Sequence, residues 1–165
     1  MAEYCRRSDG TDDVKILVLG LGNELLSDDA VGIIAVRKLG EKYKSRADIL
    51  ESSLSGLALM DILTGYKKAI IIDAVSSGRN SPGCIYELSP SDLGKVLSPS
   101  PHYSGLPEMM ALAGELGLQF PDDIKIFAVE VSDAHSFGGD LTPFVKKALD
   151  RLLEKVEVQL DAWEG

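Results

Sequence analysis

Two aspartates and a histidine are the residues of this sequence whose side chains best suit chemistry. Asp29 follows the run GLGNELLSD, Asp73 follows the apolar run AIII, and His102 lies in the proline-containing segment SPSPHYSGLP. Carboxylate oxygens and imidazole nitrogens suit borderline divalent ions such as nickel or zinc, and three protein ligands leave coordination positions open. Because the three residues are distant in sequence, only the fold can bring them together.

Each of these residues also has a purely structural interpretation. Ser27, Asp28 and Asp29 stand where a helix is expected to begin, and such residues cap free amides and favour the helix dipole. Asp73 also fits turn chemistry at the end of a strand, and a lone loop histidine is more often incidental. The chain has two histidines, and His135, in the glycine-rich segment SDAHSFGGD, is expected to face solvent.

The first half of the chain alternates between strand and helix patterns. Residues 15–20, KILVLG, form a compact apolar run that ends at glycine and predicts a buried strand. From residue 30, apolar residues recur at helical spacing. Further strands are expected at 47–53 and 67–75, with a short helix near 57–63 between them. This alternation implies parallel pairing of the strands.

The second half continues the same architecture. Residues 84–89, after the Pro82 and Gly83 turn, are expected to form an edge strand, and 123–131 form the last strand. Helices are expected at 106–116 and from Pro143, where Thr142 can cap the helix. The predicted fold is α/β, a three-layer αβα sandwich with an open, mostly parallel sheet. We expect residues 1–14 to be a disordered tail and 15–165 to be one domain.

Composition excludes several classes of protein. The 165 residues carry a formal net charge of -9, which disfavours nucleic-acid binding because that binding neutralises phosphates with Lys and Arg. No apolar run reaches the roughly 18 residues of a membrane span, and the first residues have no signal-peptide pattern. Cys5 and Cys84 are far apart, so we expect free thiols in a reducing compartment. A cytoplasmic protein is therefore predicted.

A nucleotide-binding domain is the competing interpretation, because a strand followed by GLG and a helix is typical of dinucleotide folds. The GxGxxG pattern needs a small sixth residue, and that position here is Leu25. Glu51, in the second strand, could still serve as the acid that binds a ribose. No GxxxxGK[ST] loop or GxSxG elbow occurs in the sequence.

The run LGLGNELLSDDAVG at residues 19–32 resembles the opening of the [NiFe] hydrogenase maturation endopeptidases. That family begins with glycine, any residue, glycine and asparagine, followed by an acidic pair and glycine. The later segments IIIDAV, SPHYSGL and LTPFV are similar to further family landmarks in the same order. The resemblance covers about residues 15–155. The segment EVSDAHSFGGD departs from the shorter loop of other members.

The resemblance implies removal of a C-terminal extension from the hydrogenase large subunit after nickel insertion. It assigns metal binding to Asp29, Asp73 and His102, the residues selected above on chemical grounds. The metal would be nickel, carried by the substrate or bound at the site, and zinc or cadmium can substitute. Asp28 and Glu24 are candidates for proton transfer.

Substrate binding is assigned to Gly22 and Asn23 in the same loop. Three hypotheses stand at this point: a maturation endopeptidase, a nucleotide-binding Rossmann-like module, and a non-catalytic nickel-binding maturation partner. The expected partner is the large-subunit precursor, with no nucleic acid and no membrane insertion.

Overall fold

A five-stranded sheet forms the middle layer of this computed structural model, which describes residues 15–95 and 100–165. The strand order is β2-β1-β3-β5-β4. Among these strands only the pair β4 and β5 is antiparallel, and β4 is the edge strand that the sequence predicted. The strands are β1 (Ile16–Leu21), β2 (Asp48–Ser52), β3 (Lys68–Val75), β4 (Ile85–Leu88) and β5 (Asp123–Glu130).

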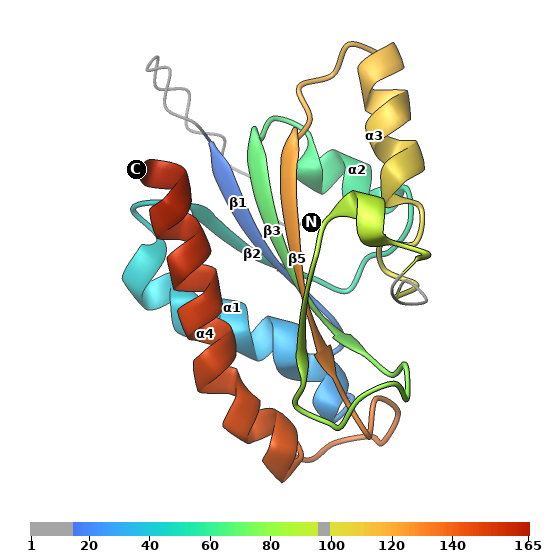
Figure 1. The fold of residues 1–165 in the computed structure, drawn as a ribbon, viewed down its shortest axis with the longest axis vertical. Coiled ribbons are helices and arrows are strands. Elements are labelled where there is room, and N and C mark those ends of the chain that lie inside the picture. Colours follow the sequence, from blue (N-terminus) through green and yellow to red (C-terminus); the bar gives the residue numbers. More distant parts are fainter. Residues whose placement is uncertain (1–14, 96–99) are drawn as a thin grey trace.

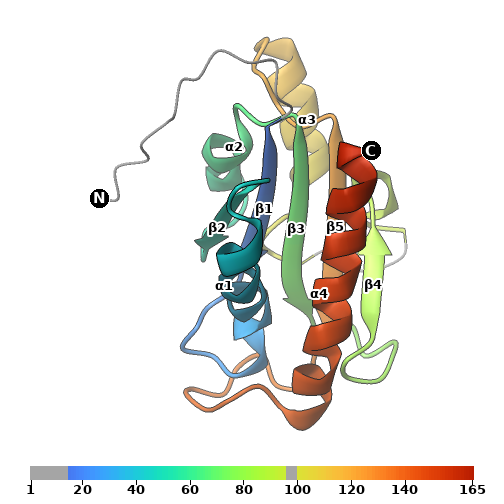
Figure 2. The same cartoon turned by 90° about the vertical axis from the view of Figure 1, so that its left-hand side faces the viewer.

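Helices cover both faces of the sheet, which confirms the predicted three-layer architecture. The long helices α1 (Val31–Tyr43) and α4 (Pro143–Glu164) lie on one face, and α2 (Ala58–Leu63) and α3 (Leu106–Glu115) lie on the other (Figure 1). Figure 2 looks onto the face that carries α1 and α4, with β2 at one edge of the sheet and β4 at the other. Short 3-10 helices occupy Asp28–Ala30 and Pro90–Asp92.

The sheet separates two hydrophobic clusters because successive side chains of a strand point to opposite faces. In β1, Val18 packs in the cluster beneath α1 and α4, whereas Leu17 and Leu19 pack in the cluster beneath α2 and α3. All residues of β1 are buried. Strands covered on both faces read as continuous apolar runs, which is why KILVLG and KKAIIIDAV were recognisable in the sequence.

A close approach of α1 to β1 sets the position of the loop between them. A Cβ atom on Gly20 would lie 2.2 Å from the carbonyl oxygen of Gly32, so glycine is required where the strand passes the helix. The next strand, β2, pairs with one edge of β1, and β3 pairs with the opposite edge of β1. The strand order therefore reverses between β1 and β3, where ligands of open α/β sheets usually bind.

Two details of the helices differ from the sequence expectations. Leu116 ends the helix expected at 106–116, but in the structure it follows the end of α3 and is 61% exposed. Thr142 is the residue before α4 as predicted, but its side chain makes no cap hydrogen bond. The predicted tail at 1–14 and Cys5 lie outside the described residues, and Cys84 is a free thiol.

Candidate metal centre

Asp29 lies in the loop between β1 and α1, within the 3-10 helix Asp28–Ala30. Gly22 shapes this loop: its φ of 142° favours glycine, and a Cβ atom there would lie 2.0 Å from the carbonyl oxygen of Asp29. The backbone N–H of Asn23 donates to Asp29 Oδ2 at 2.7 Å. That bond turns one carboxylate oxygen toward the loop backbone and fixes the side chain, so the acid does not cap its own helix.

Asp73 is a fully buried residue of β3. Its Oδ1 accepts the N–H of Ala74 at 2.9 Å, and its Oδ2 accepts the hydroxyl of Ser100 at 2.5 Å. The pKa of Asp73 is raised to about 6, and burial is the largest cause. Neighbouring Asp29 also raises this pKa, while His102 and the two hydrogen bonds lower it. The carboxylate is therefore held in place but desolvated, a state that a bound cation would relieve.

His102 lies in the turn before α3 and is half-buried. Its Nδ1 lies 3.1 Å from the carbonyl oxygen of Leu54, in the loop that follows β2. A carbonyl oxygen only accepts, so Nδ1 carries the proton in this contact and Nε2 of the neutral ring keeps its lone pair. The backbone of Gly56 also donates to the carbonyl oxygen of His102 at 3.1 Å. Such outer contacts orient the histidine ligands of metal sites.

The structure brings these three side chains together, as the sequence analysis predicted. Asp29, Asp73 and His102 each offer one ligand atom, and these atoms lie within 4.8 Å of one another. Ligands of one ion with bonds of about 2 Å lie within about 4 Å of one another, so metal binding would draw the side chains slightly inward. Two carboxylates and one imidazole form a donor set that fits nickel or zinc and leaves open coordination positions.

Asp28 has a different environment from its neighbour Asp29. It is fully buried, and its Oδ1 accepts the N–H of Thr142 at 2.7 Å, while its Oδ2 accepts the hydroxyl of Thr142 at 2.9 Å. The N–H of Asp133 also donates to Oδ2 at 3.3 Å. The expected helix-capping role is therefore wrong for Asp28, because its oxygens join the start of α1 to the start of α4.

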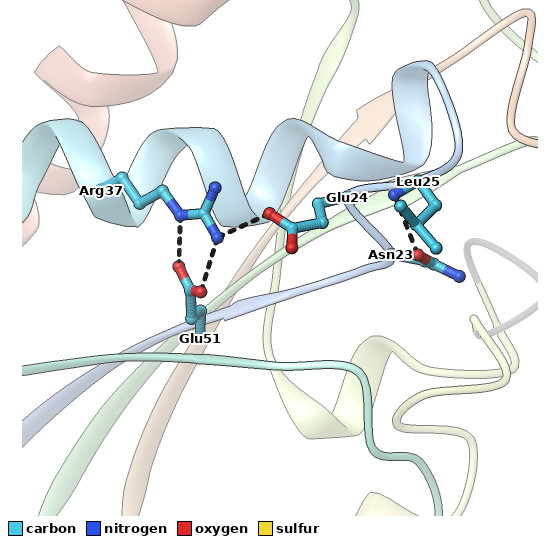
Figure 3. A network of polar contacts seen from close by, with 5 residues as sticks. All are labelled: Asn23, Glu24, Leu25, Arg37 and Glu51. Carbon is cyan, nitrogen blue, oxygen red and sulfur yellow. Dashed lines mark hydrogen bonds and ion pairs between the residues drawn. The ribbon is translucent and has the colours of Figure 1, made fainter. Parts of the chain in front are cut away.

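Glu24 is exposed and belongs to a polar network that the sequence analysis missed. Arg37 of α1 contacts Glu24 at 2.8 Å and makes two bonds of 2.7 Å to Glu51 of β2 (Figure 3). The three residues line a cleft of about 450 Å³ together with Gly22 and Asn23. Arg37 is the residue from which this network could have been predicted, because it lies on the polar face of a helix, opposite Glu51 of the adjacent strand.

The remaining candidates and partners are placed as follows. His135 is exposed, as expected. Ser100 and Leu54, which hold Asp73 and His102, were not identified from the sequence. Ser100 stands two residues before His102, but nothing in the local pattern indicates that its hydroxyl reaches β3. Leu54 acts through its carbonyl oxygen, so its side-chain type carries no signal.

The protein is an open α/β sheet that gathers two carboxylates and an imidazole, a candidate metal site, near the point where its strand order reverses. Comparison with known proteins identifies its family: residues 33–159 match the family described as hydrogenase maturation protease. The hydrogenase 2 maturation protease of Escherichia coli strain K12 is 31% identical over 147 residues, which are 87% of this chain and 88% of the relative. The chain therefore belongs to the hydrogenase maturation protease family.

Solved structures agree with this assignment. The hydrogenase maturating endopeptidase HybD from E. coli superposes with a TM-score of 0.72 at 29% identity, covering 90% of this chain and 93% of that one. The [NiFe] hydrogenase maturation protease HybD from Thermococcus kodakarensis gives a TM-score of 0.69 at 28% identity, covering 88% and 99%. No helix within residues 15–95 and 100–165 is long and apolar enough to cross a membrane.

Proposed function

We propose that this maturation protease is a metal-dependent endopeptidase that removes a C-terminal peptide from the nickel-loaded large-subunit precursor of a [NiFe] hydrogenase. The convergence of Asp29, Asp73 and His102 at the switch point of the sheet carries the proposal. Family membership supports the hydrolase activity and the class of substrate. We place the reaction in the cytoplasm.

Asp29, Asp73 and His102 would hold the ion, which is nickel carried by the substrate or bound at the site, with zinc and cadmium as substitutes. Such an ion polarises a scissile carbonyl group or activates water. The protein's own contribution is orientation. Asn23 fixes Asp29, Ser100 fixes Asp73, and the carbonyl oxygen of Leu54 fixes the tautomer of His102.

Of the two candidates for proton transfer, the structure favours Glu24 over Asp28. Both oxygens of Asp28 accept hydrogen bonds from the segment that leads into α4. Glu24 lines the open cleft, where a substrate can reach it, and only one of its oxygens contacts Arg37. Gly22 and Asn23 line the same cleft, which supports their assignment to substrate binding.

The two alternative functions are less well supported. Glu51, which would have bound a ribose in a nucleotide site, is held by two hydrogen bonds from Arg37. A non-catalytic nickel-binding partner would not be expected to belong to a family of proteases. The endopeptidase therefore remains the function that the site and the family jointly support.

Mass measurement of the large subunit tests the proposal. The precursor is incubated with the wild-type protease, with His102→Ala and with His135→Ala, which removes the exposed histidine. We expect the wild type and His135→Ala to shorten the C-terminus and His102→Ala to leave it intact. An unchanged precursor with folded wild-type protein would refute the protease assignment, and cleavage by His102→Ala would refute the site.

A further inference from the structure

The outer edge of β2, beside the candidate metal centre, pairs with no other strand of the described residues. Within residues 15–95 and 100–165, β1 is the only strand that pairs with β2. The carbonyl oxygen of Ser52 accepts the N–H of Gly22 at 3.2 Å, so the backbone groups of Ser52 face β1. Backbone orientation alternates along a strand. The N–H and C=O groups of Ile49 and Glu51 therefore face outward.

The side chains at this edge leave its backbone open to pairing. Edge strands are often blocked by proline, by lysine or by a bulge, and β2, whose sequence is DILES, has none of these features. The charged side chain of β2 nearest to the site is Glu51, and Arg37 holds its carboxylate against α1 (Figure 3). The paired carboxylate is thus kept at the α1 side of the strand.

The edge lies close to the candidate metal centre. Glu51, Ser52 and Ser53 line one side of the 450 Å³ cleft, and Gly22 and Asn23 line it as well. Asn23 donates to Asp29, and Leu54, the next residue after this run, contacts His102. A chain that follows β2 toward its carboxyl end therefore reaches the residues that contact two of the candidate ligands, Asp29 and His102.

We propose that the C-terminal segment of the large-subunit precursor adds to the sheet as an extended strand along the outer edge of β2. The outward N–H and C=O groups of Ile49 and Glu51 would bond to the substrate backbone, and the cleft would lead the scissile bond to the metal centre. This mode of recognition uses main-chain hydrogen bonds for affinity and side-chain pockets for specificity. The proposal rests on the proposed function, since it names how the same substrate is held.

Hydrogen exchange detects the added strand directly. The His102→Ala variant is mixed with intact precursor, and exchange of its backbone amides is followed by NMR. We expect the amides of Ile49 and Glu51 to exchange about tenfold more slowly in the complex, equivalent to about 1.4 kcal/mol, since each gains a backbone hydrogen bond. The outward amides of Ile85 and Glu87 on β4 are the control and should not change. Unchanged Ile49 and Glu51 amides in a complex that has formed would overturn the proposal.

A proline substitution gives a second test that does not depend on a stable complex. Glu51→Pro removes one outward N–H but no bond to β1, and edge strands tolerate proline. We expect KM for the precursor to rise about tenfold, equivalent to about 1.4 kcal/mol. Glu51→Ala keeps the N–H and loses the contact with Arg37, so it separates the backbone effect from the loss of that contact.

The matched control is Glu87→Pro on the opposite edge. The N–H of Glu130 donates to the carbonyl oxygen of Cys84, so alternation makes the N–H of Glu87 face outward, and its side chain is also ion-paired, to Lys155. The KM of Glu87→Pro for the precursor should equal that of the wild type. A wild-type KM for folded Glu51→Pro would overturn strand addition while leaving the protease assignment intact. Failure of the wild type to cleave would instead refute the proposed function.

Discussion

His102 offers one nitrogen to the candidate metal centre because the carbonyl oxygen of Leu54 occupies the other. We expect His102→Ala to weaken nickel binding by at least about a hundredfold, the upper range for loss of an outer-sphere partner alone. His135→Ala, which removes an exposed histidine, should leave the affinity unchanged. Calorimetric titration measures both affinities, and circular dichroism checks the fold. Equal affinities of the two variants would exclude His102 as a ligand.

Asp73 makes metal binding sensitive to pH near neutrality. Burial raises the pKa of this carboxyl from 3.8 to about 6, so a proton competes with the metal below that pH. We expect nickel affinity to be constant above pH 7 and to fall up to about tenfold per pH unit below pH 6. Titrations at a series of pH values measure the curve, and a flat affinity between pH 7 and pH 5 would contradict the assignment.

Ser100 provides the control for that assignment. Its hydroxyl donates to Asp73 Oδ2 and lowers the pKa of the carboxyl, in opposition to burial. Ser100→Ala should therefore raise the pKa further and move the fall in affinity to higher pH. An unshifted curve would show that Asp73 is not the group that competes.

The convergence of Asp29, Asp73 and His102 could be predicted from the sequence because each has a side chain that suits a metal and follows a recognisable strand or turn. The residues that orient them could not. Asn23 and Leu54 act through backbone groups, which every residue type possesses, and Ser100 reaches Asp73 across 27 positions. Asp28 shows the same limit, since its partner Thr142 is 114 residues away and local spacing favoured helix capping.

At the scale of elements, Asp28 joins the beginnings of α1 and α4. Thr142→Val removes one hydrogen bond and should lower the free energy of unfolding by about 1 kcal/mol. Asp28→Ala leaves the part-buried N–H groups of Thr142 and Asp133 without their acceptor, so a larger loss of about 3 kcal/mol is expected. Urea unfolding measures both. Equal losses for the two variants would argue against an anchoring role of the carboxylate.

Glu130 plays a similar role at the end of β5. Burial alone would raise the pKa of this carboxyl, but bonds from Ser77, Gly78 and Tyr86 outweigh burial and lower it below 4.5. A lowered pKa in the folded state contributes stability that is present above pH 4.5 and lost as pH falls through the folded value.

Glu130→Gln should consequently be less stable than the wild type by about 2 kcal/mol at pH 7, because hydrogen bonds to a charged acceptor are lost. The difference should shrink as pH falls below 4.5, where the wild type loses the same contribution. Urea unfolding at pH 7 and at acid pH gives the two differences. A difference that stays constant with pH would show that the ionised form is not the stabilising one.

The order and type of the elements could be predicted because β1, β3 and β5 are buried on both faces and read as continuous apolar runs. Ends of elements depend on tertiary contacts that periodicity does not record. Leu116 continues the apolar spacing of α3, but the helix ends one residue earlier and its side chain is exposed. The convergence of the three candidate ligands depends on strand order, because β3 lies beside β1 and so brings Asp73 close to the loop after β1. The family resemblance supported this grouping of the three residues.

On the scale of the whole molecule, the sheet places the candidate donor set beside a cleft, because Asn23 lines that cleft and donates to Asp29. Asp29, Asp73 and His102 supply three ligands and leave further positions for groups from a partner. The strand order reverses between β1 and β3, and ligands of open α/β sheets usually bind at such a reversal. A metal ion presented by the substrate could therefore join the two proteins.

We expect cleavage to depend on nickel in the large subunit, because an interaction that the nickel-free precursor lacks is the kind that discriminates between partners. The purified protease is incubated with nickel-loaded and nickel-free precursor, and the mass of each large subunit is followed over time. Only the loaded form should lose its C-terminal peptide, and His102→Ala should cleave neither form. Equal processing of both forms by the wild type would refute metal-gated recognition and leave the protease assignment standing.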